Sequence, residues 1–463
     1  MYLRGIHIER FKRLADLRLE FTEPDGKIRK WTVLIGPNGT GKTSILQAIA
    51  MTAVGSAELN NLANEVREHV VDRRRDQPMV TTAHWRLRGN RELGSTVRLQ
   101  PREYSYFGSA DFTVNPAATA IGVQATGIQD PLAAARASGR PGEGLDWFVA
   151  AYGLHRFVAA GRPEAPKQPA VQRLRSVFSP TTTLVGPHFL DWLPEDRARQ
   201  MAKLCAAAIK IIGEHLPGML ELELRGHGGV RTSDDLVARP RYRPRVGQNP
   251  VSPVGLPMPA LAHGIQAVLS WTTDIIGHFA TDESLGLPET KSATPEATLA
   301  ALQGTILIDE IDLHLHPLWQ AAIVPALRSA FPGMQFIVST HSPIVLAQVA
   351  PHEVVRLDVV NDEGDVDEVA ADAETGELMP KRQLGDRAYL PDPRLMSAGE
   401  LMQGMFGMAS SYPNPAAARL REYLARYPLA AGTKQQDPEL AALRSALVAE
   451  GINVESFEQG SKS

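Results

Sequence analysis

The sequence predicts an α/β protein built on a parallel sheet, and three features support this prediction. Residues 31–35 form a short apolar stretch that runs into a glycine-rich turn and then into a helical pattern. A second apolar stretch, residues 305–309, ends in acidic side chains. Between residues 305 and 360, short apolar stretches alternate with segments of helical periodicity. Short strands separated by helical segments of this length are typical of a parallel sheet with helices on both faces.

Length and composition exclude several classes of protein. At 463 residues the chain can bury a substantial core, as one large domain with insertions or as two domains. Its hydrophobic and charged fractions, 43% and 22%, are those of an ordinary globular protein. No apolar run reaches the roughly 18 residues that cross a bilayer, and the N-terminus lacks the pattern of a secretory signal. We therefore expect a soluble, cytoplasmic protein with no membrane partner.

Cysteine content and charge distribution add two further expectations. The single cysteine, Cys205, excludes an internal disulfide and a cysteine-based zinc site, and it lies in an apolar helical stretch where we expect it to be buried. Arginines concentrate in residues 73–102 and 225–245, whereas residues 353–377 are acidic. The basic stretches could bind phosphates or partner proteins, or could simply be solvated, and both interpretations stay open.

The first candidate site is the glycine-rich segment that follows the strand predicted at residues 31–35. Its sequence matches the phosphate-loop pattern of Gly, four residues and Gly-Lys-Thr, between a predicted strand and a predicted helix. Glycines let successive backbone N–H groups point at a β-phosphate, and the helix N-terminus favours an anion. We expect Lys42 to reach the β- and γ-phosphates of ATP, and the Thr43 hydroxyl to ligate Mg²⁺. The residues expected to hold the nucleotide here are Gly36, Asn38, Gly39, Gly41, Lys42, Thr43 and Ser44.

The second candidate site is the acidic end of the strand predicted at residues 305–309. A strand buried on both faces can place acidic side chains only at its carboxyl edge, where ligands bind in open α/β sheets. We expect Asp309 to hold Mg²⁺ through water, and Glu310 to take a proton from the water that attacks the γ-phosphate. A histidine, His341, follows the next predicted strand and should emerge at the same edge beside Glu310. There it could hydrogen-bond the γ-phosphate and report whether it is present.

These features together resemble the head domain of ATP-binding-cassette ATPases. Within that superfamily the chain is similar to the soluble RecF, structural-maintenance-of-chromosomes and OLD branch, whose first strand and Asn-Phe-Lys turn resemble residues 6–12. It is particularly similar to a bacterial subgroup that includes the ATPase subunits of anti-phage systems such as Septu and several retrons. That similarity is carried by residues 151–156, 309–320 and 331–343. It spans most of residues 1–355 and continues weakly into residues 397–407.

The resemblance implies a specific architecture. The fold would be an ATP-binding-cassette head, a P-loop NTPase sheet with helices on both faces, carrying a helical insertion and a small helical C-terminal extension. The expected segments are residues 1–160 (N-terminal part of the head, with the phosphate loop and insertion), 161–255 (a lid of helices and strands), 256–355 (C-terminal part of the head) and 356–463 (a hairpin and helical extension that binds a partner).

The resemblance also implies a signature loop, typically Leu-Ser-x-Gly-x-Gln, that completes the ATP site of a partner subunit. The best match begins at Leu261, with Gly264 and Gln266 in the matching positions, and opens a predicted helix. Ala262 stands where a hydroxyl side chain is usual. Losing a hydrogen bond to a charged group could cost roughly 1.5–3 kcal/mol of closed-state stability, so we expect slow hydrolysis with unimpaired ATP binding. The glutamine loop of the family is not located from sequence.

The C-terminal part shows a weaker set of patterns. Asp365 and Asp367 fit the Asp-x-Asp of the nuclease domain that OLD-type proteins carry, but they lie at a turn between two predicted strands, which favours a hairpin. Residues 416–426 and 438–449 predict amphipathic helices that contact the head or a partner subunit. In the first of these helices the apolar face is formed by Leu420, Tyr423 and Leu424.

Two hypotheses for the function follow. In the first, two copies sandwich ATP, each molecule bound by one copy's phosphate loop and the other's Gly264 loop, and the resulting switch controls a separately encoded effector, a nuclease or toxin, in anti-phage defence. In the second, the chain is a RecF-like DNA-binding ATPase in DNA repair, and the arginines of residues 73–102 and 225–245 bind duplex phosphates.

Overall fold

The described residues of the computed structural model fall into two compact units, Met1–Arg394 and Leu395–Ser463. These residues are 1–54, 62, 79–86, 92–100, 122–124, 148–155, 158, 164–166, 169–179, 182–216, 220–224, 236–240, 261–281, 294–408, 415–431, 438–450, 452 and 454. Two further sequence predictions, a polar helix near residues 58–75 and an Ala-, Gly- and Pro-rich loop at residues 117–141, fall largely outside the described residues.

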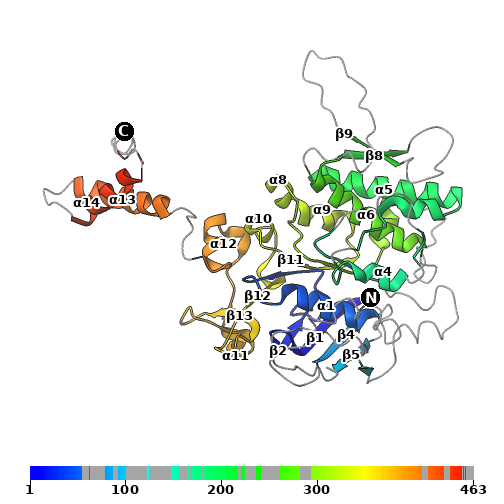
Figure 1. Cartoon of the computed structure of the whole chain (residues 1–463), viewed down its shortest axis with the longest axis horizontal. Helices are drawn as coiled ribbons and strands as arrows, with labels where there is room; N and C mark the ends of the chain where they lie inside the picture. The colour runs from blue at the N-terminus through cyan, green and yellow to red at the C-terminus, as the bar shows by residue number, and fades with distance from the viewer. Residues whose placement is uncertain are drawn as a thin grey trace, which may run out of the picture. The chain divides into compact units, whose positions relative to one another are not determined.

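An eight-stranded mixed sheet organises the first unit (Figure 1). Its order is β14-β13-β12-β3-β11-β10-β7, with β15 paired to β13, and the strands from β12 to β7 run parallel. The parallel strands are β3 (Trp31–Ile35), β7 (Val149–Tyr152), β10 (Gly304–Ile308), β11 (Met334–Ser339) and β12 (Val354–Val359). Every residue of β3, β7, β10 and β11 is buried, which explains their continuous apolar sequences. The predicted parallel sheet is confirmed.

Helices cover both faces of this sheet, as predicted for a P-loop NTPase. On one face lie α1 (Lys42–Val54) and a five-stranded antiparallel sheet of order β2-β1-β4-β5-β6 (Figure 1). Its strands are β1 (Tyr2–Phe11), β2 (Leu14–Glu20), β4 (Met79–Arg86), β5 (Glu92–Gln100) and β6 (Gly122–Gln124). The α1 side chains Ile45 and Ile49 share one apolar core with Ile6 of β1 and Leu307 of β10. On the other face lie α5 (Glu195–His215), α6 (His263–Thr281) and α9 (Ile323–Ala330).

The remaining elements of the first unit are the other strands of the main sheet, a separate strand pair and several short helices. The sequence patterns of residues 220–224 and 236–243 predict a pair of strands, and the structure confirms it as β8 and β9, which pair antiparallel. The bounds are α4 (Pro169–Arg175), η2 (Gly186–Trp192), β8 (Leu220–Leu224), β9 (Leu236–Pro240), α7 (Pro295–Ala301), α8 (Pro317–Gln320), α10 (Pro343–Leu346), η5 (Pro351–Glu353), β13 (Val366–Asp372), β14 (Leu378–Pro380), α11 (Lys381–Leu384), η6 (Gly385–Arg387), β15 (Ala388–Tyr389) and η7 (Pro393–Leu395), which runs into the second unit.

The sequence pattern of residues 317–330 predicts a single helix, and this prediction is wrong, because the structure contains two short helices there. The first, α8, ends at Gln320, and the second, α9, starts at Ile323. Pro325 lies in the first turn of α9. A proline lacks the N–H that a continuous helix needs and its ring clashes with the carbonyl four residues earlier, so one helix ends before it and a new one begins.

A buried glutamine on β11 ties the two sheets together. Gln335 is fully buried, and its Oε1 accepts hydrogen bonds from the Leu3 N–H at 2.8 Å and the Thr305 hydroxyl at 3.0 Å. Its Nε2 donates to the carbonyls of Leu3, at 2.9 Å, and Arg29, at 3.1 Å. One amide therefore satisfies polar groups of β1, of β10 and of the residues that lead into β3.

The acidic Asp-x-Asp pattern lies in the predicted hairpin. Strands β12 and β13 pair antiparallel, and the turn between them is closed by a hydrogen bond from the Val360 N–H to the Asp365 carbonyl at 2.9 Å. Asp367 is buried rather than solvated, and its Oδ2 lies 2.9 Å from Nε of Arg382. Because β13 extends the main sheet, the hairpin belongs to the first unit and not to a separate extension.

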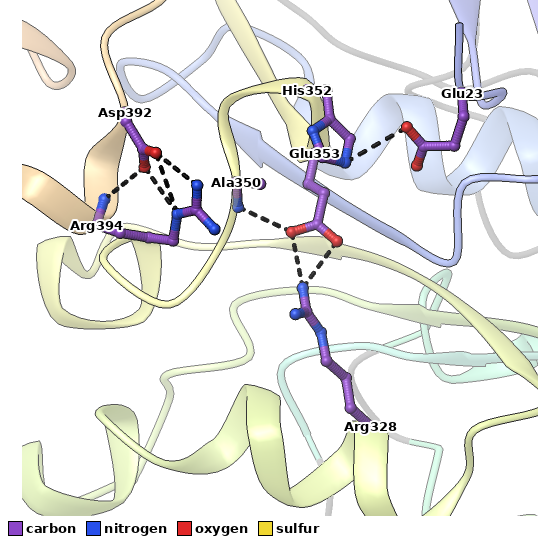
Figure 2. A network of polar contacts seen from close by, with 7 residues as sticks. All are labelled: Glu23, Arg328, Ala350, His352, Glu353, Asp392 and Arg394. Atoms are coloured by element: carbon purple, nitrogen blue, oxygen red, sulfur yellow. Dashed lines mark hydrogen bonds and ion pairs between the residues drawn. The ribbon is translucent and has the colours of Figure 1, made fainter. Parts of the chain in front are cut away.

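A network of polar contacts lies at the end of the sheet where β12 begins (Figure 2). Nη2 of Arg328, on α9, lies 2.8 and 2.7 Å from the two carboxylate oxygens of Glu353. Glu353 also accepts from the Ala350 N–H at 2.8 Å, and Nε2 of His352 lies 3.4 Å from Glu23, between β2 and β3. The network connects α9, η5 and the segment between β2 and β3. Figure 2 also shows the local pair of Asp392 and Arg394.

The second unit is helical, as predicted. It contains α12 (Ala398–Gly404), α13 (Pro415–Ala431) and α14 (Pro438–Ala449). Tyr423, Leu447 and Val454 form a small core, against which Leu420 and Leu424 pack, so the predicted apolar face is confirmed. Arg419 pairs with Glu450, and Arg426 pairs with Glu439, across the two helices.

Two expectations about single features can be compared with the structure. Cys205 is buried in α5, as expected, and burial raises the pKa of its thiol. Among the residues that the structure describes, no helix is both long and apolar enough to cross a membrane.

Replacing Gln335 by Leu should lower the free energy of unfolding by about 2–4 kcal/mol, because the substitution leaves buried backbone groups of Leu3 and Arg29 without their partner. Urea denaturation would measure the change. Gln348→Leu is the matched control, since Nε2 of Gln348 reaches only the Ile344 carbonyl one turn away at 3.4 Å. A change within about 0.5 kcal/mol is expected for the control. Equal losses in the two variants would contradict the assigned role of Gln335.

Candidate functional site

The predicted phosphate loop connects β3 to α1 and depends on glycine at two positions. A Cβ at Gly36 would lie 2.3 Å from the Leu357 carbonyl oxygen, so no larger residue fits beside β12. Gly41 has φ of 82° in the left-handed region, and the side chain of Leu14 approaches within 3.0 Å of where its Cβ would be. In the rest of the loop, Asn38 and Gly39 are exposed and Ser44 is buried.

Lys42 is folded back onto this loop. Its Nζ donates to the carbonyls of Gly36 at 2.8 Å and Pro37 at 3.0 Å. Burial lowers the pKa of the Lys42 ammonium, and the nearby carboxylates of Asp309 and Glu310 oppose that shift. The structure therefore places a cation within the curve of the loop, with anions beside it.

Asp309 joins three segments of the chain. Thr43 Oγ1 donates to Asp309 Oδ2 at 2.7 Å, although the two residues are 266 positions apart in sequence. Ser339 Oγ donates to Asp309 Oδ1 at 2.6 Å, and the Asp309 N–H donates to the carbonyl of Tyr152 at 2.8 Å. The side chain is 3% exposed. A hydroxyl and a carboxylate in contact are oxygen ligands of the kind that Mg²⁺ prefers, so these residues fit that ion.

Glu310 and His341 lie on neighbouring loops, as the parallel sheet predicts. The two loops are joined by hydrogen bonds from the Glu310 N–H to Ser339 Oγ at 2.8 Å and from the Ile311 N–H to the Ser339 carbonyl at 3.0 Å. Glu310 has φ of 45°, a conformation that costs energy for a residue with a side chain and that is common at active sites. His341 is half-buried.

Side-chain hydrogen bonds hold the loop that carries His341. Thr340 donates its hydroxyl to Asp312 Oδ1 and accepts from the Ser342 N–H at 3.0 Å. Ser342 Oγ donates to Gln320 Oε1 at 2.6 Å, and Gln320 Nε2 donates to the Leu315 carbonyl at 3.0 Å. These side chains join the loop after β11 to Asp312, in the loop after β10, and to Gln320, at the end of α8.

The predicted signature loop, residues 261–266, packs against the loop that follows β10. A Cβ at Gly264 would lie 2.6 Å from the His314 carbonyl oxygen. Gln266 Nε2 donates to the Leu261 carbonyl at 2.7 Å, which closes the loop on itself. Ala262 and the first residue of α6, His263, are exposed. Packing within the chain therefore explains why a glycine occupies position 264, and Ala262 and His263 are exposed to solvent.

Two parts of the site were not found from sequence. The first is β7, which pairs with β10 and brings Tyr152 beside Asp309 and the exposed His155 to the same edge of the sheet. The only sequence feature that pointed to β7 was the Ala-Tyr-Gly similarity at residues 151–153. The second is Arg13, in the tight turn between β1 and β2, whose Nη1 lies 3.6 Å from the Cβ position of Gly39. No sequence pattern joined this turn to the phosphate loop.

The predicted DNA-binding arginines lie mostly outside the described residues. The exceptions are Arg86 in β4, Arg98 in β5 and Arg239 in β9. Within the described ranges, no group of three or more His, Cys, Asp or Glu residues is arranged to hold a metal ion.

Two protein families match this chain, one over the segment with the phosphate loop and one over the segment with the acidic end of β10. Residues 1–80, with the phosphate loop, match the family described as "AAA ATPase domain". Residues 281–347, with Asp309, Glu310 and His341, match the family described as "AAA domain, putative AbiEii toxin, Type IV TA system".

Similar proteins include a Septu protein, a probable retron ATPase and one solved structure. The chain is 23% identical to the Septu protein PtuA of Bacillus mycoides over 77% of this chain and 40% of that protein. It is 59% identical to the "Retron Vc95 probable ATPase" of Vibrio cholerae over 11% of this chain and 10% of that protein. The chain thus spans less than half the length of either relative. The SMC head domain from Thermotoga maritima aligns with a TM-score of 0.40 and 15% identity, covering 79% of this chain and 98% of that one.

The phosphate loop and the carboxylate that meets it lie in the two segments that match these AAA families. The chain thus carries two segments of AAA type, and it is similar to a Septu protein and to a probable retron ATPase.

Proposed function

We propose that this protein is an ATP-dependent switch subunit, in which two copies close around ATP and thereby control a separately encoded effector in anti-phage defence. The observation that carries the proposal is the contact between Thr43 and Asp309, which joins the phosphate loop to the acidic end of β10 at the carboxyl edge of the sheet. Ligands bind at this edge in open α/β sheets.

The residues of this edge account for ATP binding. The N–H groups of the phosphate loop and the N-terminus of α1 would bind the phosphates, and Lys42 would move from the loop carbonyls to the β- and γ-phosphates. The residues expected to bind there are Gly36, Asn38, Gly39, Gly41, Lys42, Thr43 and Ser44. Thr43 and Asp309 would hold Mg²⁺, which when bound neutralises phosphate charge. Arg13, beside Gly39, would add a second cation.

Hydrolysis would depend on the loops after β10 and β11. Glu310 would accept a proton from the attacking water, and His341 would hydrogen-bond the γ-phosphate. Ser339 Oγ donates to the Asp309 carboxylate and accepts from the main-chain N–H of Glu310, which supports a fixed distance between the proposed magnesium ligand and the main chain of the proposed base. Such preorganisation would lower the cost of aligning the site when ATP binds.

Closure of two copies would use the exposed start of α6. Residues Leu261, Gly264 and Gln266 form a closed loop at a helix N-terminus, where an anion is favoured. In the dimer this loop would face the γ-phosphate held by the other copy. Because Gly264 touches the loop after β10, the state of one copy's Glu310 could reach the surface presented to its partner.

The role in defence and the existence of an effector rest on the resemblance to Septu and retron ATPases and on no contact in this chain. A nuclease or toxin is the expected effector. The DNA-repair hypothesis has no supporting observation among the described residues.

Glu310→Gln should leave ATP binding intact and lower kcat at least about 100-fold, because glutamine cannot accept the proton. With Mg·ATP the variant should double its solution mass, measured by light scattering after size exclusion. Lys42→Ala in the same background is the control and should keep the monomer mass, because it cannot hold the phosphates. A mass that is multimeric without nucleotide and unchanged by ATP would contradict ATP-driven closure.

Ala262→Ser should strengthen closure, because it restores a hydroxyl at an exposed position of the signature loop. A hydrogen bond to a charged group contributes about 1.5–3 kcal/mol, so the ATP-bound dimer of the Glu310→Gln background should dissociate at a protein concentration lower by at least about tenfold. Gly264→Val should do the opposite, because its side chain would collide with the His314 carbonyl. Sedimentation at graded protein concentrations measures both. Unchanged dimer affinity in both variants would place the partner-facing surface elsewhere.

A further inference from the structure

A carboxylate is buried in the middle of α6, away from the nucleotide site. Asp274 is 3% exposed, and four groups surround it. Its Oδ1 accepts from the N–H groups of Val185 at 2.9 Å and Gly186 at 3.1 Å, where η2 begins. Its Oδ2 accepts from the Tyr152 hydroxyl at 3.1 Å and lies 3.0 Å from Nε2 of His278, one turn further along α6.

The chemistry of these contacts defines the protonation of the cluster. Burial by itself raises the pKa of Asp274, but the contacts with His278, Gly186 and Tyr152 more than offset this effect and leave the pKa below its usual value. The carboxylate is therefore ionised at neutral pH and can only accept hydrogen bonds. Nε2 of His278 must then carry a proton, and the Tyr152 hydroxyl must donate. Burial beside Asp274 raises the pKa of Tyr152, which keeps that hydroxyl protonated.

Stability alone does not explain a charge at this position. Moving a carboxylate out of water carries a large desolvation cost, and well-packed apolar residues often replace a buried ionic group with no loss of stability. The surroundings are closely packed: a Cβ at Gly277 would lie 2.5 Å from the ring of Phe189, on η2. Apolar contacts of this kind hold α6 near η2, but they do not define its position along the sheet, because they lack direction. Hydrogen bonds to one carboxylate of α6 from two other elements, the start of η2 and β7, do define it.

The partners of Asp274 lead to both parts of the proposed switch. Tyr152 ends β7, and its carbonyl accepts the N–H of Asp309, the proposed magnesium ligand. In the other direction, α6 begins with the loop of residues 261–266, whose Gly264 touches the His314 carbonyl. One residue, Tyr152, therefore bonds to the site through its main chain and to α6 through its side chain.

We propose that Asp274 is a positioning residue that holds α6 in register with β7, and so sets the place of the 261–266 loop relative to Asp309. This inference rests on the proposed function, because it assigns the 261–266 loop to the partner's ATP. Movement of β7 when ATP and magnesium engage Asp309 would be passed through Tyr152 and Asp274 to the start of α6.

The test uses the full chain and compares Tyr152→Phe with Asp274→Ala and Asp274→Asn. Phenylalanine keeps the ring and the main-chain bond to Asp309 and removes only the hydroxyl. We expect it to leave the dissociation constant of a fluorescent ATP analogue within about twofold and to lower kcat about tenfold, since small displacements of reacting groups are costly. Hydrogen exchange of the amides at the start of α6 should become faster. Asp274→Ala should show the same changes more strongly.

Asp274→Asn is the conservative rescue. Its Oδ1 can still accept from the amides of Val185 and Gly186, and its NH₂ can donate to Tyr152 and to His278 after a change of tautomer. It should therefore retain more kcat and slower exchange than Asp274→Ala. Thr272→Val is the matched control, because the Thr272 hydroxyl is buried on the same helix with no hydrogen-bond partner among the described residues. It should change neither quantity.

The outcomes separate this inference from the proposed function. If Tyr152→Phe lowers the thermal unfolding temperature but leaves kcat and exchange at the start of α6 as in the parent, Asp274 only stabilises the fold and the inference is wrong. Equal effects of Thr272→Val, or no rescue by Asn, would also overturn it. If the Glu310→Gln variant does not gain mass with ATP, the closure proposal fails. The exchange comparison still decides whether Asp274 positions α6.

Discussion

The arrangement of the site depends on the carboxylate of Asp309, which accepts hydrogen bonds from Thr43 on the phosphate loop and from Ser339 at the end of β11. These contacts are possible because β3, β11 and β10 are consecutive neighbours in one parallel sheet. Their carboxyl ends therefore meet at one edge, although the segments are far apart in sequence. A buried carboxylate is stable only when its oxygens are satisfied, and here the partners that satisfy it also form the site.

Polar side chains buried between layers give this fold its register. Gln335 satisfies backbone groups of β1 and of the residues leading into β3, and so ties the antiparallel sheet to the parallel one. Asp274 does the same for α6, η2 and β7 on the other face. Apolar packing supplies most of the stability of such layers but is non-directional. The polar contacts select one relative position, and the candidate site requires one, because its residues come from elements on both sides.

The loop after β10 contacts several parts of the proposed machinery. Glu310, at its start, is bonded to Ser339, and Asp312 receives the hydroxyl of Thr340, next to His341. Further along, the His314 carbonyl meets Gly264 at the start of α6. Under the proposed function, a change at the γ-phosphate would therefore be separated from the exposed start of α6 by only a few residues of this loop. This proximity gives a physical basis for a switch in which binding at one edge alters a surface presented to a partner.

The sequence by itself determined the local elements of this protein: the buried strands, the phosphate loop, the acidic end of β10 and the amphipathic C-terminal helices. Each depends on residues close together in the chain, through side-chain periodicity, glycine conformation and the burial of a parallel strand. Only the tertiary structure revealed that β7 lies beside β10, that Arg13 lies beside Gly39, and that Tyr152 meets Asp274. The residues of each pair are far apart in sequence, so helix or strand periodicity does not relate them. The sequence around a single tyrosine or aspartate does not indicate whether the side chain is solvated or buried. Its contacts are therefore known only from the packing of the layers.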